Sequence, residues 1–312
     1  MRTCVTMTAI IRPRTVASVV RSAQVRVRYG LNLPTGGAAG DARTLGEFAA
    51  LAEAAGWDGV FMEDYLVYQD RQDIPTYDPW VALAVMATRT QRLRLGTEVT
   101  PLARRRPWKV ARETVTLDHL SGGRLVLGVG LGVASAIDMA HFGEQTDNRR
   151  RADQLDEALE VLVGLWSGEP FSYAGAHYAI RETTFLPRPV QQPRIPIWVG
   201  GGYPNRGPMR RPARWDGACL YRVESPGSSV DVGSLPPDNI RALKRFVERE
   251  RRASTEFDIV VGGRKRGEDW ERERDTIRAV DDAGATWWIE WIPPGDPDAM
   301  RMAIERGPIR ID

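Results

Sequence analysis

The segment "IPIWVGGGYPNRGPMRRPARWDG" (Ile195–Gly217) contains one full strand-to-strand repeat of this chain. Its apolar start is typical of a buried parallel strand, and three glycines, Gly200–Gly202, follow directly. An arginine-rich, helix-like stretch then leads to a second strand that opens at Asp216. The glycines have two explanations: a tight turn that needs positive φ, or a cradle in which backbone N–H groups approach a phosphate.

The same alternation of strand and helix runs along the chain from Val25 onward. Strands are expected at 25–33, 58–64, 92–101, 123–132, 196–200, 216–222, 257–263 and 286–291. Helices are expected at 43–56, 78–90, 107–121, 149–168, 237–252, 268–284 and 297–305, with the helix-like segment reaching Trp215. An open doubly wound sheet rarely has eight such units, and its G-x-G-x-x-G fingerprint is absent after the first strand. The pattern therefore predicts an α/β fold of the (β/α)8 TIM-barrel type.

We expect residues 25–312 to form this one barrel domain. Residues 1–24 are rich in arginine, and no acidic residue precedes Asp41, so we expect them to be a tail outside the fold. An insertion between Gly168 and Ile195 separates the fourth and fifth strands, and its centre, 171–180, reads as a β-hairpin. Its aromatic residues either cap the mouth of the barrel or pack the hairpin onto the barrel wall. They are Phe171, Tyr173, Tyr178 and Phe185.

The charge balance argues against several classes of partner. The 43 basic and 41 acidic residues give a net charge of +2 and are interspersed, so neither nucleic acid nor a membrane surface is expected as a partner. The two cysteines and three histidines lack the spacing of metal ligands, so we expect no metal site. No run approaches 18 apolar residues, and we expect a cytoplasmic protein.

Ligands of such barrels bind at the edge formed by the carboxyl ends of the strands, so the residues there are the candidate site. They are Asn32–Pro34, Glu63–Tyr65, Glu98–Thr100, Gly128–Gly132, Gly200–Gly202, Tyr221–Arg222, Gly262–Arg264 and Glu290–Trp291. Glycine-rich exits let a flat ring or a phosphate approach the backbone, although tight loops also collect glycine without any ligand. Carboxylates and aromatic walls complete the set.

Three segments resemble a known family. "LAEAAGWDGVFMEDY", "LRLGTEVTPLARRRPWKVARETVTLDHLSGGRLVLGVGLG" and the opening segment occur in the order and spacing of the bacterial-luciferase-like flavin enzymes, and the resemblance covers about 29–217 well. It implies a (β/α)8 barrel that binds reduced FMN, often supplied by a separate flavin reductase, or the deazaflavin coenzyme F420. It also implies a small organic substrate and a homodimer.

The resemblance assigns cofactor-binding roles. Gly200, Gly201 and Gly202 match the loop that holds the cofactor phosphate, with the "GGR" at Gly262–Arg264 as the rival. Glu98 and Val99 match a position where relatives often have a strained peptide, sometimes cis, beneath the flavin ring; a normal trans bulge is the alternative. Gly130 and Gly132 are expected to give the ring or its ribityl chain close backbone approach, and Leu33 is expected beside the cofactor.

Two departures affect the chemistry. Asp64 matches an acidic position of the family, but Tyr65 stands where its functional histidine usually stands; we predict both as catalytic, with Tyr65 either a hydrogen-bond donor or a packing wall. Leu131 and Val133 stand where some relatives carry an arginine or an acidic residue, so neither cofactor is favoured there. The run Arg104–Arg106 either meets an anionic group or is a solvated basic loop.

The leading hypothesis is a flavin-dependent monooxygenase that uses reduced FMN and oxygen on a small organic substrate. An F420-dependent hydride-transfer oxidoreductase is the alternative, and a catalytically degenerate flavin-binding protein is the third possibility.

Overall fold

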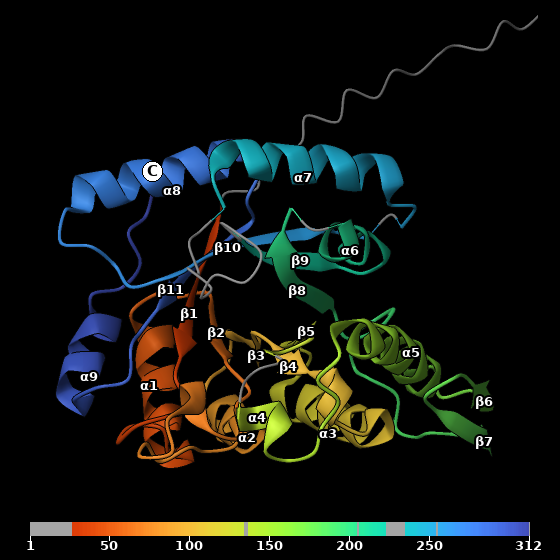
Figure 1. The fold of residues 1–312 in the computed structure, drawn as a ribbon. Helices are drawn as coiled ribbons and strands as arrows, with labels where there is room; N and C mark the ends of the chain where they lie inside the picture. The colour runs from red at the N-terminus through yellow and green to blue at the C-terminus, as the bar shows by residue number, and fades with distance from the viewer. Residues whose placement is uncertain (1–26, 134–136, 205, 223–234, 254, 312) are drawn as a thin grey trace, which may run out of the picture.

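The computed structural model describes residues 27–311 except 134–136, 205, 223–234 and 254 (Figure 1). Eight parallel strands close into a barrel because the last, β11, pairs back onto β1. In barrel order they are β1 (Arg28–Leu33), β2 (Gly59–Met62), β3 (Arg94–Thr97), β5 (Leu125–Gly130), β8 (Ile197–Tyr203), β9 (Gly217–Arg222), β10 (Asp258–Arg264) and β11 (Trp287–Trp291). The predicted (β/α)8 barrel is confirmed. The expected tail, 1–24, lies outside the described residues.

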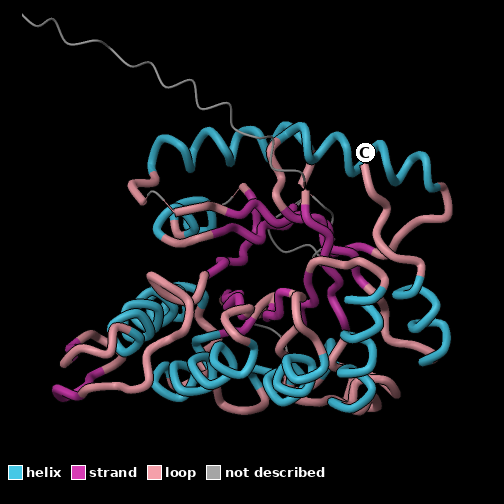
Figure 2. Tube along the Cα trace, turned by 180° about the vertical axis from the view of Figure 1, so that it is seen from behind, coloured by secondary structure: helices cyan, strands magenta, loops and turns pink. Residues whose placement is uncertain are grey.

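Helices surround the strands on the outside of the barrel (Figure 2). The long ones are α1 (Ala42–Ala54), α2 (Pro79–Arg89), α3 (Pro107–Ser121), α5 (Asn148–Trp166), α7 (Pro237–Glu250), α8 (Trp270–Ala283) and α9 (Pro297–Glu305). The short elements are α4 (Ile137–Ala140), α6 (Arg206–Arg210), the 3-10 turns η1 (Tyr68–Asp70), η2 (Leu102–Arg104) and η3 (Pro212–Arg214), and the two-residue strand β4 (Thr100–Pro101). Local chemistry sets the boundaries: the Asp78 side chain caps α2 by accepting from the Trp80 and Val81 N–H groups.

Two expectations about element length are wrong. The strand expected at 92–101 is divided into β3 and β4, because Glu98 and Val99 stand between the two paired segments. The helix-like segment before Trp215 contains only the five-residue α6 and the turn η3. Pro212 begins that turn and has no backbone N–H to continue a helical hydrogen-bond ladder.

Side chains alternate between two buried layers. Those facing outward pack between strands and helices, whereas those facing inward fill the barrel. The inner cluster consists of Phe61, Val126, Trp198, Cys219, Val260, Trp287 and Ile289. Phe61 belongs to this inner cluster, so every second residue from Phe61 along β2 also faces the inside of the barrel.

The inserted hairpin packs against the outside of the barrel. It consists of β6 (Phe171–Ala174) and β7 (Ala179–Thr183), as expected, and lies beside α5 at the edge of the molecule (Figure 1). The Tyr173 hydroxyl donates to Glu160 of α5 at 3.0 Å, and the Tyr178 ring meets Trp108 of α3 edge-on at 6.3 Å. The packing explanation of these aromatic residues is therefore correct, and the mouth-capping explanation is wrong.

Within the described chain, no helix has the length and apolar character needed to span a bilayer.

Candidate functional site

The three glycines of the opening segment belong to a strand. Gly200, Gly201 and Gly202 continue β8 and pair in register with Cys219, Leu220 and Tyr221 of β9. None of the three has a positive φ. The tight-turn explanation is therefore wrong, and the backbone approach to a cofactor phosphate stays a prediction.

A cis peptide joins Glu98 to Val99, as the resemblance implied for this position. Its neighbours on the facing wall are glycines. A Cβ at Gly130 would lie 2.6 Å from Val99 Cγ2, and a Cβ at Gly200 would lie 2.9 Å from Val99 Cγ1. The Val99 side chain thus fills the room that these two glycines leave, and the three predicted residues form one ledge in the barrel.

The loop after β5 turns at Gly132, whose φ of 71° is in the left-handed region that glycine favours. Arg151 of α5 is almost fully buried and donates to the carbonyl oxygens of Leu131 and Gly132 at 2.7 and 3.2 Å. This arginine, which the sequence did not single out, fixes the path of a predicted cofactor-binding loop.

The rival anion site after β10 is occupied by protein contacts. Gly262 and Gly263 both have positive φ and accompany a register shift between β10 and β11. Arg264 forms an ion pair with Glu273 at 2.7 Å. The guanidinium is already neutralised, which argues against a phosphate anchor there.

Asp64 is held by two arginines. Its side chain is 1% exposed, and its Oδ1 accepts from Arg104 and Arg105, each at 2.8 Å. Burial would raise the pKa of Asp64, but Arg105 and Arg104 outweigh it, so the pKa lies below its ordinary value. Arg104 also pairs with Asp138 at 2.6 Å and is 3% exposed, so the solvated-loop explanation of this arginine is wrong.

The acidic groups at the mouth are Glu63 and Glu98, at the ends of β2 and β3. Each lies two positions beyond an inward residue, Glu63 beyond Phe61 and Glu98 beyond Gly96, and these two inward residues are paired in register. Each glutamate is half-buried, and each has an Oε2 atom that is inaccessible and lacks a hydrogen-bond partner. Burial raises the pKa of Glu63 to about 7. Burial, and then the charge of Glu63, raise the pKa of Glu98 to about 8.

Two tyrosines flank this pair. The half-buried Tyr65 ring meets Tyr68 edge-on at 5.3 Å, and the Tyr68 hydroxyl is a hydrogen-bonding partner of Glu63. Burial and then the charge of Glu63 raise the pKa of Tyr65, so its phenol is a neutral donor at ordinary pH. This state is compatible with the predicted donor role, which stays a prediction.

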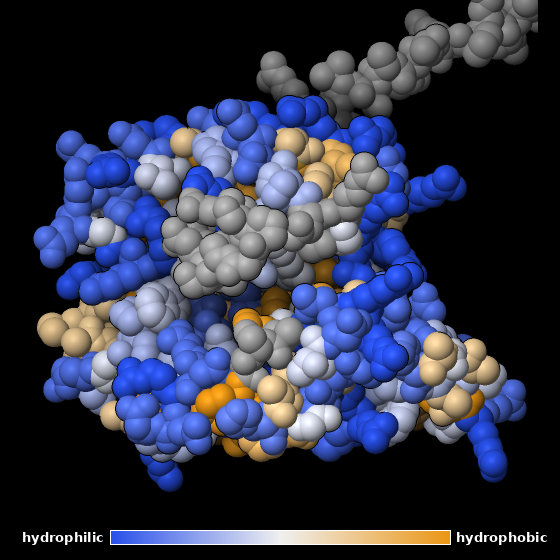
Figure 3. Space-filling model, viewed as in Figure 1, coloured by the Kyte–Doolittle hydropathy of each residue, from blue (hydrophilic) through white to orange (hydrophobic). Residues whose placement is uncertain are grey.

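Leu33 is the last residue of β1. Its side chain is fully buried in the core cluster, and a cofactor-binding role for Leu33 stays a prediction. Its neighbour Asn32 is paired in register with Trp291 and has a buried Oδ1 without a partner, whereas the Trp291 side chain is a hydrogen-bonding partner of Tyr68. Figure 3 shows that this face of the molecule is hollowed near its centre, where the barrel strands lie in Figure 1.

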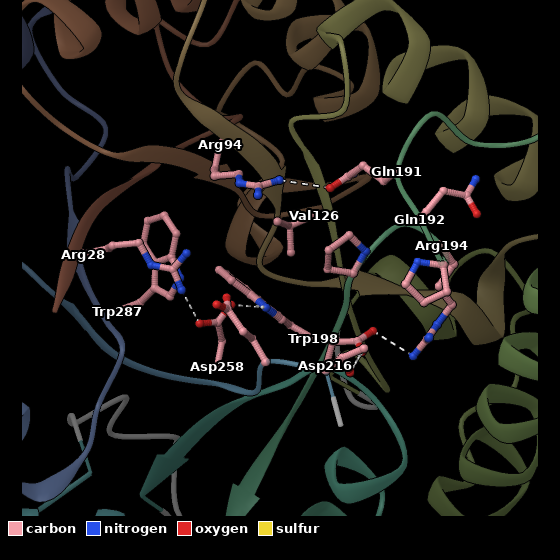
Figure 4. Close-up of a pocket in the computed structure, with 14 residues that line it drawn as sticks. Arg28, Arg94, Val126, Gln191, Gln192, Arg194, Trp198, Asp216, Asp258 and Trp287 are labelled. Atoms are coloured by element: carbon pink, nitrogen blue, oxygen red, sulfur yellow. Dashed lines mark hydrogen bonds and ion pairs between the residues drawn. The ribbon is translucent and has the colours of Figure 1, made fainter. Parts of the chain in front are cut away.

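The opposite end of the barrel contains a cavity of about 220 Å³ (Figure 4). Its charged groups are engaged: Arg28 pairs with Asp258, and Arg194 pairs with Asp216 at 2.8 Å. The Trp198 indole N–H also donates to Asp258 at 3.2 Å. These contacts join the amino ends of different strands and close the barrel at this end.

Comparison with known proteins identifies the family. A family model described as luciferase-like monooxygenase matches residues 27–206, more than half of the chain. The chain belongs to this luciferase-like family of oxidoreductases.

Its relatives include enzymes named for F420. An F420-dependent glucose-6-phosphate dehydrogenase of Microbacterium testaceum (strain StLB037) is 36% identical over 162 residues, which cover 51% of this chain and 46% of that protein. A protein of the same name from Nakamurella multipartita is 32% identical over 234 residues, which cover 74% of this chain and 65% of that protein. The matches span less than two thirds of either relative.

Among solved structures, an F420-dependent secondary alcohol dehydrogenase in complex with an F420-acetone adduct has a TM-score of 0.71. It is 16% identical, and the match covers 92% of this chain and 99% of that chain. At this identity the likeness shows the fold alone.

The residues at the mouth fit a cofactor of the flavin type. A flavin or deazaflavin ring presents hydrogen-bond donors and acceptors along one edge. The unpartnered buried atoms of Asn32, Glu63 and Glu98 lie at the ends of three adjacent strands and fit such partners. The glycine positions of β5 and β8 form the facing wall.

Proposed function

We propose that this luciferase-like protein is an oxidoreductase that transfers hydride between coenzyme F420 and a small hydroxyl or carbonyl substrate. The observation that carries the proposal is the name shared by its relatives, at 32–36% identity over half to three quarters of this chain. The sequence alone favoured reduced FMN with oxygen, and the relatives support F420 better.

The chain's own residues supply binding and orientation. When bound, F420 accepts or donates a hydride at a carbon of its ring. Val99, with Gly130 and Gly200 behind it, gives the ring a flat apolar support, and Asn32 offers an acceptor to its polar edge. Arg151 keeps the neighbouring loop in place.

A side-by-side titration of the purified protein with F420 and with FMN tests the cofactor. We expect F420 to bind at least tenfold more tightly, which corresponds to about 1.4 kcal/mol. Tighter binding of FMN would overturn the proposal. Oxygen consumption coupled to substrate oxidation by FMN-loaded protein would establish the monooxygenase in its place.

The substrate class is tested by following F420 reduction. The relatives are named for glucose-6-phosphate, so that sugar phosphate and a panel of small alcohols form the first set. We expect reduction of F420 by at least one of them at the same rate with and without air. Binding of F420 without turnover on any hydroxyl or carbonyl compound would support the degenerate binding protein. The homodimer stays a prediction.

A further inference from the structure

Two carboxyl groups stand side by side at the mouth of the barrel without a cation. Glu98 N donates to the Met62 carbonyl oxygen at 2.8 Å, which holds the ends of β2 and β3 together. Glu63 follows Met62 directly, and it faces inward with Glu98 because both continue the inward positions Phe61 and Gly96.

The arginines near these two glutamates form ion pairs with other acids. Arg104 and Arg105 bind Asp64, and Arg104 also binds Asp138. Neither Glu63 nor Glu98 forms an ion pair with any residue that the structure describes. Two carboxylates on neighbouring strand ends, in a half-buried site without a cation, disfavour each other's ionisation, so the pair is most stable when it keeps one proton.

The other titratable groups around the pair are neutral. Tyr68 hydrogen-bonds to Glu63, and Tyr65 senses the charge of Glu63. Cys219 of β9 is buried, and its pKa is raised by burial and then by Glu98. The pKa values of about 7 for Glu63 and about 8 for Glu98 agree with a pair that titrates near neutrality.

We propose that Glu63 and Glu98 hold one proton between them and exchange it with the substrate oxygen during hydride transfer. This role rests on the proposed function. When the hydroxyl substrate is oxidised, its C–H bond breaks and both electrons leave with the hydride to the coenzyme. The O–H bond breaks, the C=O bond forms, and the hydroxyl proton passes to the ionised carboxylate of the pair. The pair then holds two protons and returns one to water; in the reverse reaction it donates one to the carbonyl oxygen.

The pair, and not Asp64, is the proton-exchange site because its oxygens are free. Asp64 is charged and bound by two guanidinium groups, so a proton there would break both ion pairs. Glu63 and Glu98 each keep a buried oxygen without a hydrogen-bond partner at the carboxyl ends of their strands.

The first test needs neither cofactor nor substrate. Protein labelled with ¹³C at the glutamate carboxyl carbon is titrated by NMR from pH 4 to 10, as wild type, Glu63→Gln, Glu98→Gln and the control Glu305→Gln. We expect two resonances that titrate between pH 6 and 9 in wild type and in the control. Each single variant loses one of them, and the pKa of the remaining group falls because its like-charged neighbour is gone. Two ordinary pKa values near 4.3, or a remaining group that does not respond, would overturn the shared proton.

The second test uses the F420-loaded enzyme. We expect Glu63→Gln and Glu98→Gln to lower kcat at least a hundredfold and to change the Kd for F420 less than threefold, whereas Glu305→Gln changes neither. Unchanged kcat in either variant would overturn the catalytic role. Failure of F420 to bind wild type would refute the proposed function, and the catalytic role with it, while the cofactor-free titration still decides whether the proton is shared. Thermal unfolding of each variant checks that it is folded.

Discussion

The two ends of this barrel differ in whether particular buried acids have arginine partners. At the amino ends of the strands, the mostly buried Asp216 and Asp258 both have arginine partners, and Asp258 also accepts from the Trp198 indole N–H (Figure 4). At the carboxyl ends, Glu63 and Glu98 have no cation, and glycines take the place of bulky side chains on the facing wall. In barrels of this type the first end serves stability and the second serves function.

The largest expected effect is at the amino end. Trp198 is fully buried, and its ring lies 5.0 Å from Phe61 and 5.6 Å from Trp287. We expect Trp198→Ala to lower the free energy of unfolding by about 3–5 kcal/mol, because it leaves a cavity and removes a donor from Asp258. Urea unfolding measures this, with the partly exposed Trp108→Ala as control. Equal losses in the two variants would contradict a special stabilising role for this end.

The second effect separates Asp64 from its neighbour Glu63. Asp64→Asn removes the charge opposite Arg104 and Arg105, and we expect a loss of about 3 kcal/mol in unfolding free energy. Glu63→Gln removes a charge that has no partner, and we expect no loss at neutral pH. Urea unfolding of both at pH 7 compares them. A greater loss for Glu63→Gln would reverse the roles given to these adjacent acids.

That pair also shows how far the sequence leads. All four residues of Gly59–Met62 are apolar and buried, so the sequence does not show which of them face inward. The structure places Phe61 in the inner cluster, and the period of two then places Glu63 on the same side and Asp64 on the other. The family resemblance pointed to Asp64 because it matches an acidic position by alignment. Glu63 could be assigned to the inward face only after the structure had shown Phe61 in the inner cluster.

Other features depend on contacts that no local pattern encodes. The number of strands, most helix ends and the hairpin follow from periodicity, caps and turn residues. The place where the hairpin packs depends on a tertiary contact, the hydrogen bond from the Tyr173 hydroxyl to Glu160 of α5. The strand conformation of Gly200–Gly202 depends on pairing with β9, because glycine has no side-chain alternation to reveal it.

The third effect is a dependence of stability on pH. Glu98 has a raised pKa, so it keeps its proton in the folded state while the unfolded chain loses it above about pH 4.3. Its contribution to stability is therefore full at low pH and is lost as pH rises through about 8. We expect Glu98→Gln, which stays neutral, to gain on the order of 5 kcal/mol relative to wild type between pH 4 and pH 9. Urea unfolding across this range measures it.

Glu273 provides the control of opposite sign. Burial would raise its pKa, but Arg264 and the Gly267 N–H outweigh burial and lower it. Its contribution to stability is therefore present above the unfolded pKa and lost on acidification, so Glu273→Gln is expected to be less stable than wild type at pH 7 and to approach it at low pH. Parallel pH profiles for the two variants would contradict the opposite environments of these acids.

The smallest effect tests the glycine wall. A Cβ at Gly130 would lie 2.6 Å from Val99 Cγ2, so Gly130→Ala must displace the ledge proposed to support the ring. We expect a loss of about 1–2 kcal/mol in unfolding free energy and a tenfold weaker Kd for F420. Gly295→Ala is the matched control, because a Cβ there meets nothing within 4 Å and its φ is not positive. A Gly130→Ala variant that is destabilised but binds F420 as wild type does would limit Gly130 to packing against Val99, and the cofactor would then depend on the acidic and aromatic wall alone.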